Sequence, residues 1–186
     1  MAVIKRRPDR GSVASRNVRL AKPSSSVTAE AILKSAAANG IRTVPLDIDK
    51  LVQAYGVSLK RRPLEDDISG HLKAGDTGWI ITVNSLHHPR RQRFTLAHEL
   101  GHFILHSGGD HRDFVDKALF RSDQTSPEET EANRFAAGLL MPSEEFKRFA
   151  KDQSSKVEDI AEYFGVSALA VRVRAKELGF KGHGLN

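Results

Sequence analysis

The chain has 186 residues, a length that suits one domain or one domain with a small appendage. Hydrophobic residues make up 39% and charged residues 28%, and no apolar run approaches the roughly 20 residues that span a bilayer. The absence of cysteine excludes disulfide bonds, thiolate metal sites and a cysteine nucleophile. We therefore expect no membrane partner. Because the N-terminus also lacks the apolar stretch of a secretory signal, the expected location is the cytoplasm.

The net charge of +6 is concentrated at the N-terminus. Residues 1–26 hold seven basic residues and one acidic residue, so the rest of the chain is neutral. The serine, proline and arginine content of this segment is typical of a solvated chain, and we predict a basic, disordered tail over residues 1–26. The alternative is a basic arm that makes weak, non-specific contacts with DNA phosphates.

The predicted elements are helices first, then a small sheet, then helices alone. Thr28 can cap the first helix, and Pro45-Leu46-Asp47 opens the second. Alternating apolar residues predict three strands, and the segment around Asp113 is predicted to be a loop. This order indicates an α+β fold. The predicted helices and strands cover residues 28–39, 45–56, 57–60, 69–72, 79–84, 91–106, 127–140, 143–151 and 156–178.

One predicted helix carries a metal-binding motif. His98-Glu99-Leu100-Gly101-His102 matches H-E-x-x-H, in which two histidines one helical turn apart bind the same Zn²⁺. Glu99, beside the first histidine, is the expected general base for the attacking water. Apolar residues at helical spacing flank the motif and indicate a helix buried on one side. This pattern argues against a chance match on a surface helix.

A catalytic zinc site usually has three protein ligands, so a third is required. His106 continues the spacing of four, but it lies about 12 Å along the axis from the first histidine and is expected beside the site. Glu129 extends the inward-facing apolar stripe of the helix predicted at 127–140, whereas Glu131 is expected to face solvent. Asn133, one turn after Glu129, is a candidate partner for the second nitrogen of a histidine ligand.

Two blocks of sequence resemble the ImmA/IrrE family of zinc metallopeptidases. They are RFTLAHELGHFILH at residues 93–106 and ETEANRFAAGLLMP at residues 129–142, and the resemblance extends over about residues 28–180. It implies a zincin-like domain in which a small mixed β-sheet packs on the metal-binding helix. It also implies that Glu129, the first glutamate of the second block, is the third zinc ligand, in agreement with the apolar stripe.

The predicted function is that of a zinc metallo-endopeptidase, with Zn²⁺ bound by His98, His102 and Glu129 and with Glu99 as the catalytic base. The resemblance implies that its substrate is a partner helix-turn-helix repressor, in phage, mobile-element, toxin–antitoxin or stress-response regulation. The alternative is a non-hydrolytic regulatory module that docks a repressor or DNA. Three residues are candidates by type alone for stabilising the tetrahedral oxyanion: His71, Tyr55 and Tyr163.

The chain is predicted to have three parts: the tail at 1–26, a peptidase domain at 27–152 and a C-terminal segment at 153–186. The C-terminal segment resembles a helix-turn-helix, with a turn at Gly165-Val166-Ser167. We expect it to pack on the peptidase domain or to dock a partner, with weak DNA contact as the alternative. The strand at 79–84 is either an edge on which an extended peptide lies or a central strand.

Overall fold

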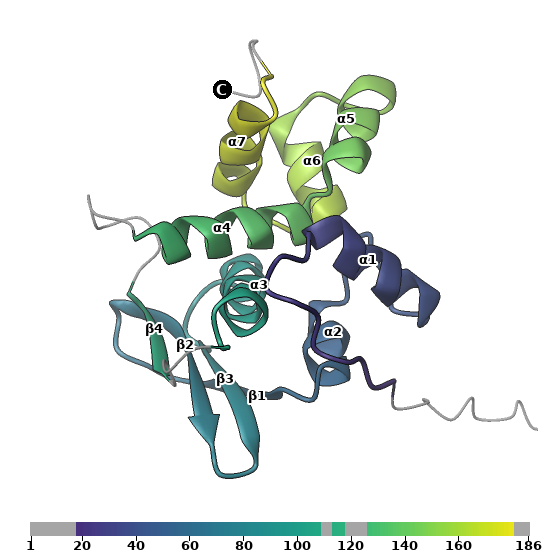
Figure 1. Cartoon of the computed structure of the whole chain (residues 1–186). Helices are drawn as coiled ribbons and strands as arrows, with labels where there is room; N and C mark the ends of the chain where they lie inside the picture. The colour runs from purple at the N-terminus through teal and green to yellow at the C-terminus, as the bar shows by residue number, and fades with distance from the viewer. Residues whose placement is uncertain (1–17, 109–112, 118–125, 181–186) are drawn as a thin grey trace, which may run out of the picture.

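The computed structural model describes residues 18–108, 113–117 and 126–180. Within them the fold is α+β, as predicted, with a small mixed sheet followed by helices (Figure 1). None of the described helices is both long and apolar enough to cross a membrane. The elements are α1 (Ala29–Ala38), α2 (Ile48–Ala54), β1 (Ser58–Arg62), β2 (Ile68–Gly75), β3 (Gly78–Asn84), α3 (Pro89–Leu105), β4 (Asp113–Lys117), α4 (Pro127–Leu140), α5 (Ser143–Asp152), α6 (Val157–Phe164) and α7 (Ala168–Glu177).

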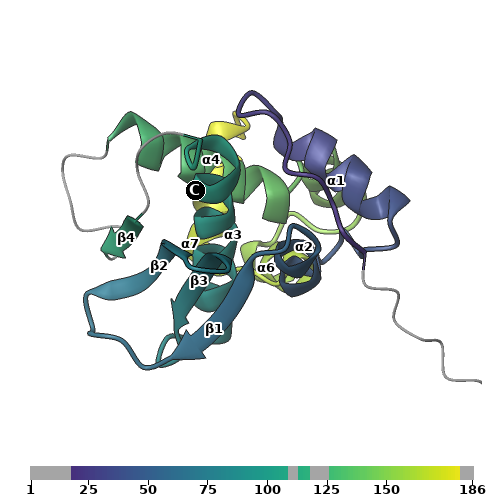
Figure 2. The same ribbon diagram turned by 60° about the horizontal axis from the view of Figure 1, so that its bottom comes forward.

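The helix α3 is the central element of the fold. The sheet covers one side of it and α4 crosses the other, while α2 packs at its flank (Figures 1 and 2). Every residue of α3 from Thr95 to Ile104 is buried, so this stretch is enclosed on all sides and not only on the one side that its apolar spacing predicts. Gly101 lets α4 come close, because a Cβ placed there would lie 3.3 Å from the Cα of Ala132. The motif helix is therefore held on both sides.

The sheet has the strand order β1-β3-β2-β4, in which β1 and β3 are parallel and the other neighbours are antiparallel. The strand predicted at 79–84 corresponds to β3, which has a neighbour on each side. Of the two predicted alternatives, the central position is therefore the one observed, and β3 has no open edge on which a peptide could lie. The edges are β1 and β4.

The strand β4 was not predicted, because the segment around Asp113 carries turn-like polar residues and has little apolar alternation of its own. The prediction of a loop is therefore wrong for Asp113–Lys117. These residues form a strand by pairing with β2, where Phe114 lies opposite Leu72. Pairing and burial against a neighbour decide strand formation more than local propensity does.

The N-terminal prediction can be followed from Val18 onward, since residues 1–17 lie outside the described part. Residues 18–26, which were predicted to be part of the tail, form contacts with the folded part of the chain. The amide of Leu20 donates to the Ala54 carbonyl at 2.7 Å, and Lys22 Nζ donates to Ser107 Oγ at 2.6 Å. Lys22 also lies over the ring of Phe103, 5.1 Å from its centre. The segment is thus fastened to the ends of α2 and α3.

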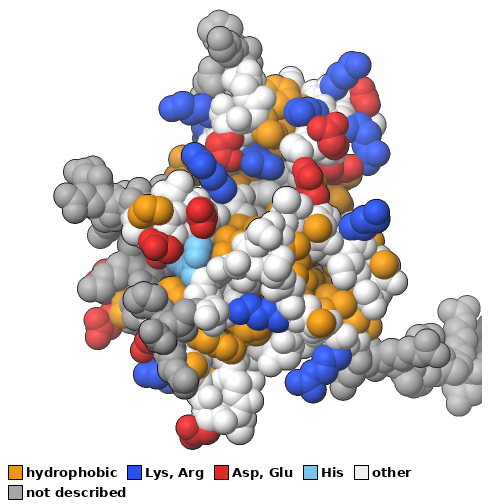
Figure 3. All heavy atoms as spheres, viewed as in Figure 1, with side chains coloured by type: hydrophobic (Ala, Val, Ile, Leu, Met, Phe, Trp, Pro, Cys, Tyr) orange, Lys and Arg blue, Asp and Glu red, His pale blue; other side chains and the backbone are white. Residues whose placement is uncertain are grey.

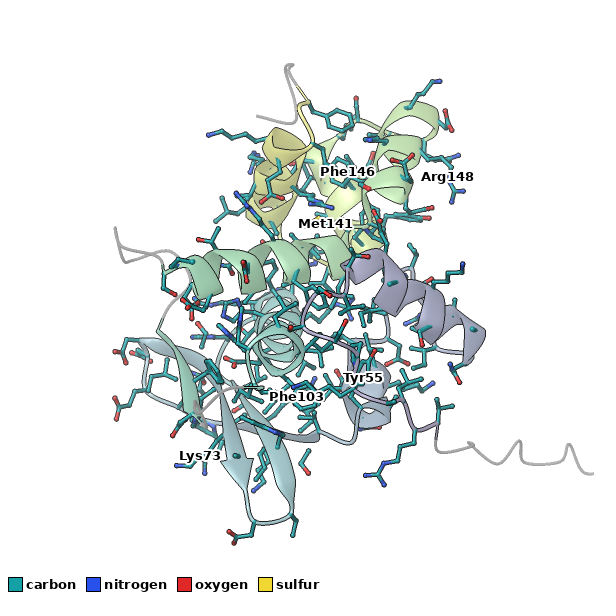
Figure 4. All side chains as sticks on the ribbon, viewed as in Figure 1. Tyr55, Lys73, Phe103, Met141, Phe146 and Arg148 are labelled. Carbon is teal, nitrogen blue, oxygen red and sulfur yellow. The ribbon has the colours of Figure 1, made fainter. Side chains whose placement is uncertain are left out.

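The helices α6 and α7 form a helix-turn-helix-like pair, with Gly165 in the left-handed conformation at the turn. Side-chain hydrogen bonds join the pair to α3, to the end of α4 and, through Tyr163, to Glu145 of α5. Arg93 Nε of α3 donates to the Gly165 carbonyl at 3.0 Å, and Arg174 Nε of α7 donates to the Met141 carbonyl at 3.1 Å. Met141 lies at the end of α4 (Figure 4). A boundary near residue 152 stays a prediction.

Candidate metal centre

The structure brings His98, His102 and Glu129 together. The histidines lie on successive turns of α3, and Glu129 lies in the first turn of α4, where Ser126 caps the helix by accepting a hydrogen bond from the Glu129 amide. The two histidine Nε2 atoms are 2.9 Å apart. Glu129 Oε2 is 3.2 Å from His98 Nε2, and Glu129 Oε1 is 3.1 Å from His102 Nε2. Two imidazole nitrogens and both oxygens of one carboxylate therefore converge on one point.

These separations fit a metal ion. Ligand atoms about 2.0–2.2 Å from a tetrahedral zinc ion lie roughly 3.3–3.6 Å from one another, a few tenths of an ångström more than the observed distances. The Asn133 side chain adds a chemical argument, because its Oδ1 lies 3.0 Å from His98 Nδ1. An amide oxygen only accepts, so neutral His98 carries its proton on Nδ1 and presents a lone pair at Nε2. That lone pair faces a carboxylate oxygen, an arrangement that a shared cation would stabilise.

The protonation states also suit metal binding. Burial lowers the pKa of His102, which favours the neutral ring, against the opposing hydrogen bond with Glu129. Burial alone would raise the pKa of Glu129, but hydrogen bonds with His102 and His98 lower it well below its ordinary value. Near neutral pH the group is therefore an ionised carboxylate next to a neutral imidazole, the forms in which these side chains bind metals.

Glu99 lies on the side of α3 that faces the sheet. Its side chain is fully buried, and its carboxylate packs against Gly70 of β2. Glu99 directly follows His98 in the chain. The two side chains therefore project from α3 about 100° apart around the helix axis. Among the described residues, the group that could hold a metal consists of His98, His102 and Glu129. Glu99 is next to His98 in the sequence but is not part of this group.

Residues 52–176, more than half of the chain, match the family described as the IrrE N-terminal-like domain. The chain belongs to the ImmA/IrrE family. Its predicted zincin-like α+β fold, with a small mixed sheet beside the motif helix, is the fold of that family.

The ImmA/IrrE family includes curated relatives of this chain. The radiation response metalloprotease IrrE of Deinococcus radiodurans is 35% identical over 106 residues, which cover 50% of this chain and 32% of the relative. The protein of the same name from Deinococcus deserti is 43% identical over 67 residues, which cover 35% of this chain and 23% of that protein. The matched parts thus span a third or less of these relatives, and they support a metalloprotease at the level of the family.

A solved structure supports the fold of this ImmA/IrrE chain. A Mycobacterium tuberculosis transcriptional regulator superposes with a TM-score of 0.56 at 23% sequence identity. The superposition covers 80% of this chain and 46% of that chain. At this level of identity the similarity concerns the fold alone, and it extends over most of the ImmA/IrrE chain.

Three predicted neighbours of the site lie as expected, and one further neighbour was not predicted. Asn133 contacts the first histidine of the motif, as predicted. The ring of His106 lies 5.4 Å from that of His102, beside the cluster, and Glu131 is exposed, as expected. Phe114 of β4 was not predicted, yet its ring stacks on His102 at 5.0 Å between centres. It was missed because it lies on the strand that the sequence did not indicate.

The three oxyanion candidates lie away from the cluster. Tyr55 ends α2, on the other side of the molecule from the first turn of α4 (Figure 4). Tyr163 of α6 donates to Glu145 and stacks on Phe149. His71 alternates with Gly70 along β2, so it points to the face of the sheet opposite α3. Residue type alone had suggested them, and the fold removes all three from this role.

The cluster is almost covered by its surroundings. His98 is fully buried and His102 is 2% exposed, while the Glu129 side chain is 34% exposed. On the face shown in Figure 3, a small area of histidine surface is visible next to acidic side chains below α4. The carboxylate is thus the most accessible member of the group, and the two rings are held by the core.

Proposed function

We propose that this protein is a zinc-dependent endopeptidase that uses His98, His102 and Glu129 as metal ligands and Glu99 as the general base. The observation that carries the proposal is the convergence of three ligand groups: the Nε2 atoms of His98 and His102 are 2.9 Å apart, and each lies 3.1–3.2 Å from one oxygen of the Glu129 carboxylate. The buried Glu99 lies beside them on the helix of the two histidines. Two imidazole nitrogens and a carboxylate are a donor set suited to zinc. The family of the chain supports peptide hydrolysis as the chemistry.

The residues around the metal would have separate roles in catalysis. A bound zinc ion supplies a Lewis acid that activates water and polarises a carbonyl near neutral pH. Asn133 orients the His98 ring and fixes its proton on Nδ1. Glu99 accepts the proton of the attacking water and later delivers it to the leaving amine nitrogen. Because Glu99 is buried against β2, its carboxylate would stay in one position between the two proton transfers.

The proposed substrate is a helix-turn-helix repressor that acts in the same cell compartment, the cytoplasm. This part of the proposal rests on the resemblance to the ImmA/IrrE family, because no contact in the described structure identifies a substrate. Regulation of a phage, mobile-element, toxin–antitoxin or stress-response system would follow from cleavage of such a repressor.

Co-expression tests the proposal. Helix-turn-helix repressors encoded in the same genome are expressed with the wild-type protein or with Glu99→Gln, and products are identified by mass spectrometry. We expect a discrete cleavage product with the wild type, and its loss both with Glu99→Gln and after chelation of the metal. General-base removal of this kind costs roughly 10²–10⁴-fold in rate. Repressors that stay intact, or a phenotype that Glu99→Gln leaves unchanged, would instead support the non-hydrolytic binding module.

A further inference from the structure

Gly70 occupies the point at which β2 passes closest to Glu99. Along β2, side chains alternate between the two faces of the sheet, and Leu72, two residues further on, is fully buried against the core. A side chain at position 70 would therefore point at α3. The backbone of Gly70 is not in the left-handed region, so its conformation is open to any residue. The reason for glycine here is space.

A side chain at position 70 would collide with two side chains of α3 and with the backbone of the neighbouring strand β3. A Cβ placed at Gly70 would lie 2.6 Å from Thr95 Cγ2, 2.8 Å from the Thr82 carbonyl oxygen and 3.3 Å from Glu99 Oε1. Ordinary contacts between carbon atoms are about 3.5–4.0 Å. Thr95 and Glu99 are both fully buried and lie one turn apart on α3. They fill the volume that a residue with a Cβ would need.

We propose that Gly70 is a positioning residue for the general base, because the bare backbone of β2 leaves room for the Glu99 carboxylate and for Thr95 beneath it. The inference rests on the proposed function, since it assigns Gly70 a role through Glu99. His98 and His102 point toward Glu129 of α4, away from this contact. An obstruction at position 70 should therefore disturb the base and leave metal binding largely intact.

Gly101 provides the matched contrast. It lies on α3 only two residues after Glu99, but a Cβ there would meet the Cα and carbonyl oxygen of Ala132 in α4, both at 3.3 Å. Gly101 thus controls the approach of the helix that carries Glu129. Two close-packed glycines on opposite sides of α3 then have separable effects: position 101 acts on the metal ligand and position 70 acts on the base.

Alanine variants with two readouts test this separation. Zinc affinity is measured by competition with a chromophoric chelator, and kcat and KM are measured on a peptide spanning the bond that the wild-type protein cleaves. We expect Gly70→Ala to keep its zinc affinity and KM while kcat falls roughly 10- to 100-fold, the scale of a misplaced catalytic group. Gly101→Ala should lose zinc affinity. Gly108→Ala, where a Cβ meets nothing within 4 Å, is the neutral control.

A rescue variant distinguishes positioning of the base from general damage. Thr95→Ser removes the Cγ2 atom that makes the tightest contact and retains the hydroxyl. We expect Gly70→Ala/Thr95→Ser to recover part of the lost kcat, while Thr95→Ser alone stays near wild type. If Gly70→Ala does not fold, the double variant is compared with Thr95→Ser, and a lower kcat at equal zinc affinity supports the proposal.

Three results would overturn the inference: wild-type kcat in Gly70→Ala, parallel losses of kcat and zinc affinity in that variant, or, where Gly70→Ala does not fold, equal kcat in the double variant and Thr95→Ser. Other results would refute the proposed function itself. These are a zinc-loaded wild type that cleaves nothing, or a Glu99→Gln variant that cleaves as well as the wild type, and neither involves a glycine variant.

Discussion

At the scale of single residues, the chemistry of the centre depends on which atoms carry protons. Asn133 Oδ1 contacts His98 Nδ1 at 3.0 Å and thereby assigns the ring tautomer. His102 has a different environment, with the rings of Phe114 and His106 packed against it. The two predicted histidine ligands are therefore held in different ways, one by a hydrogen bond and the other by ring packing. The amide of Asn133 is the more specific of the two supports.

Loss of this amide should weaken metal binding. We expect Asn133→Ala to lower zinc affinity by about 10- to 100-fold, because the His98 ring loses the partner that fixes its orientation and tautomer. Asn133→Asp, which keeps an acceptor, should retain more of the affinity. Chelator competition measures both, with the exposed neighbour Arg134→Ala as the control. Equal affinity in Asn133→Ala and the control would show that the hydrogen bond has no such role.

At the scale of elements, the sequence predicts the helices well and the sheet in part. The motif helix, α4 and Glu129 follow from apolar spacing of 3.6 residues, a periodicity set within each helix. The strand β4, Phe114 and the role of Gly70 do not follow, because each depends on a neighbour that is distant in sequence. The central position of β3 is of the same kind. Pairing partners, not local patterns, decide these features.

His71 in the sheet should make the free energy of unfolding depend on pH. Burial lowers the pKa of His71 below its ordinary value of 6.5, and nearby Asp113 opposes this while Arg62 and Lys73 reinforce it. The unfolded chain then takes up more protons than the folded chain as the pH falls through about 6.5, so this histidine removes stability on acidification. We expect the free energy of unfolding to fall less between about pH 8 and pH 5.5 in His71→Gln than in the wild type.

Chemical denaturation at the two pH values measures this difference. The variant and the wild type share every other titrating group, so their contrast isolates His71. An identical loss of stability in both proteins would show that the folded structure does not perturb this ring.

At the scale of the whole molecule, the helix-turn-helix-like pair is joined to the part that carries the centre. Arg93 links α3 to the turn at Gly165, and Arg174 links α7 to the end of α4. Residues 153–180 carry four basic and four acidic residues, so this described segment has no net charge to attract DNA. The predicted packing of this segment on the rest of the fold is observed, while docking of a partner and contact with DNA stay predictions.

Removal of one link should be visible in stability. Arg174→Ala deletes the donor to the Met141 carbonyl, and we expect it to lower the free energy of unfolding by about 1–3 kcal/mol. Limited proteolysis should also cleave faster between α5 and α6. Arg172→Ala, an exposed change on the same helix, should stay within about 0.5 kcal/mol of the wild type. If the two variants behave alike, the link does not hold α7 in place.

The most direct test of the account is the metal content of the purified protein. Elemental analysis of zinc-supplemented wild type should find one zinc ion per chain. Glu129→Ala and His98→Ala should bind far less, and Glu99→Gln should bind as much as the wild type. A wild-type protein that comes back without zinc, or a Glu129→Ala variant that retains a full equivalent, would contradict the claim that these three side chains form the metal centre.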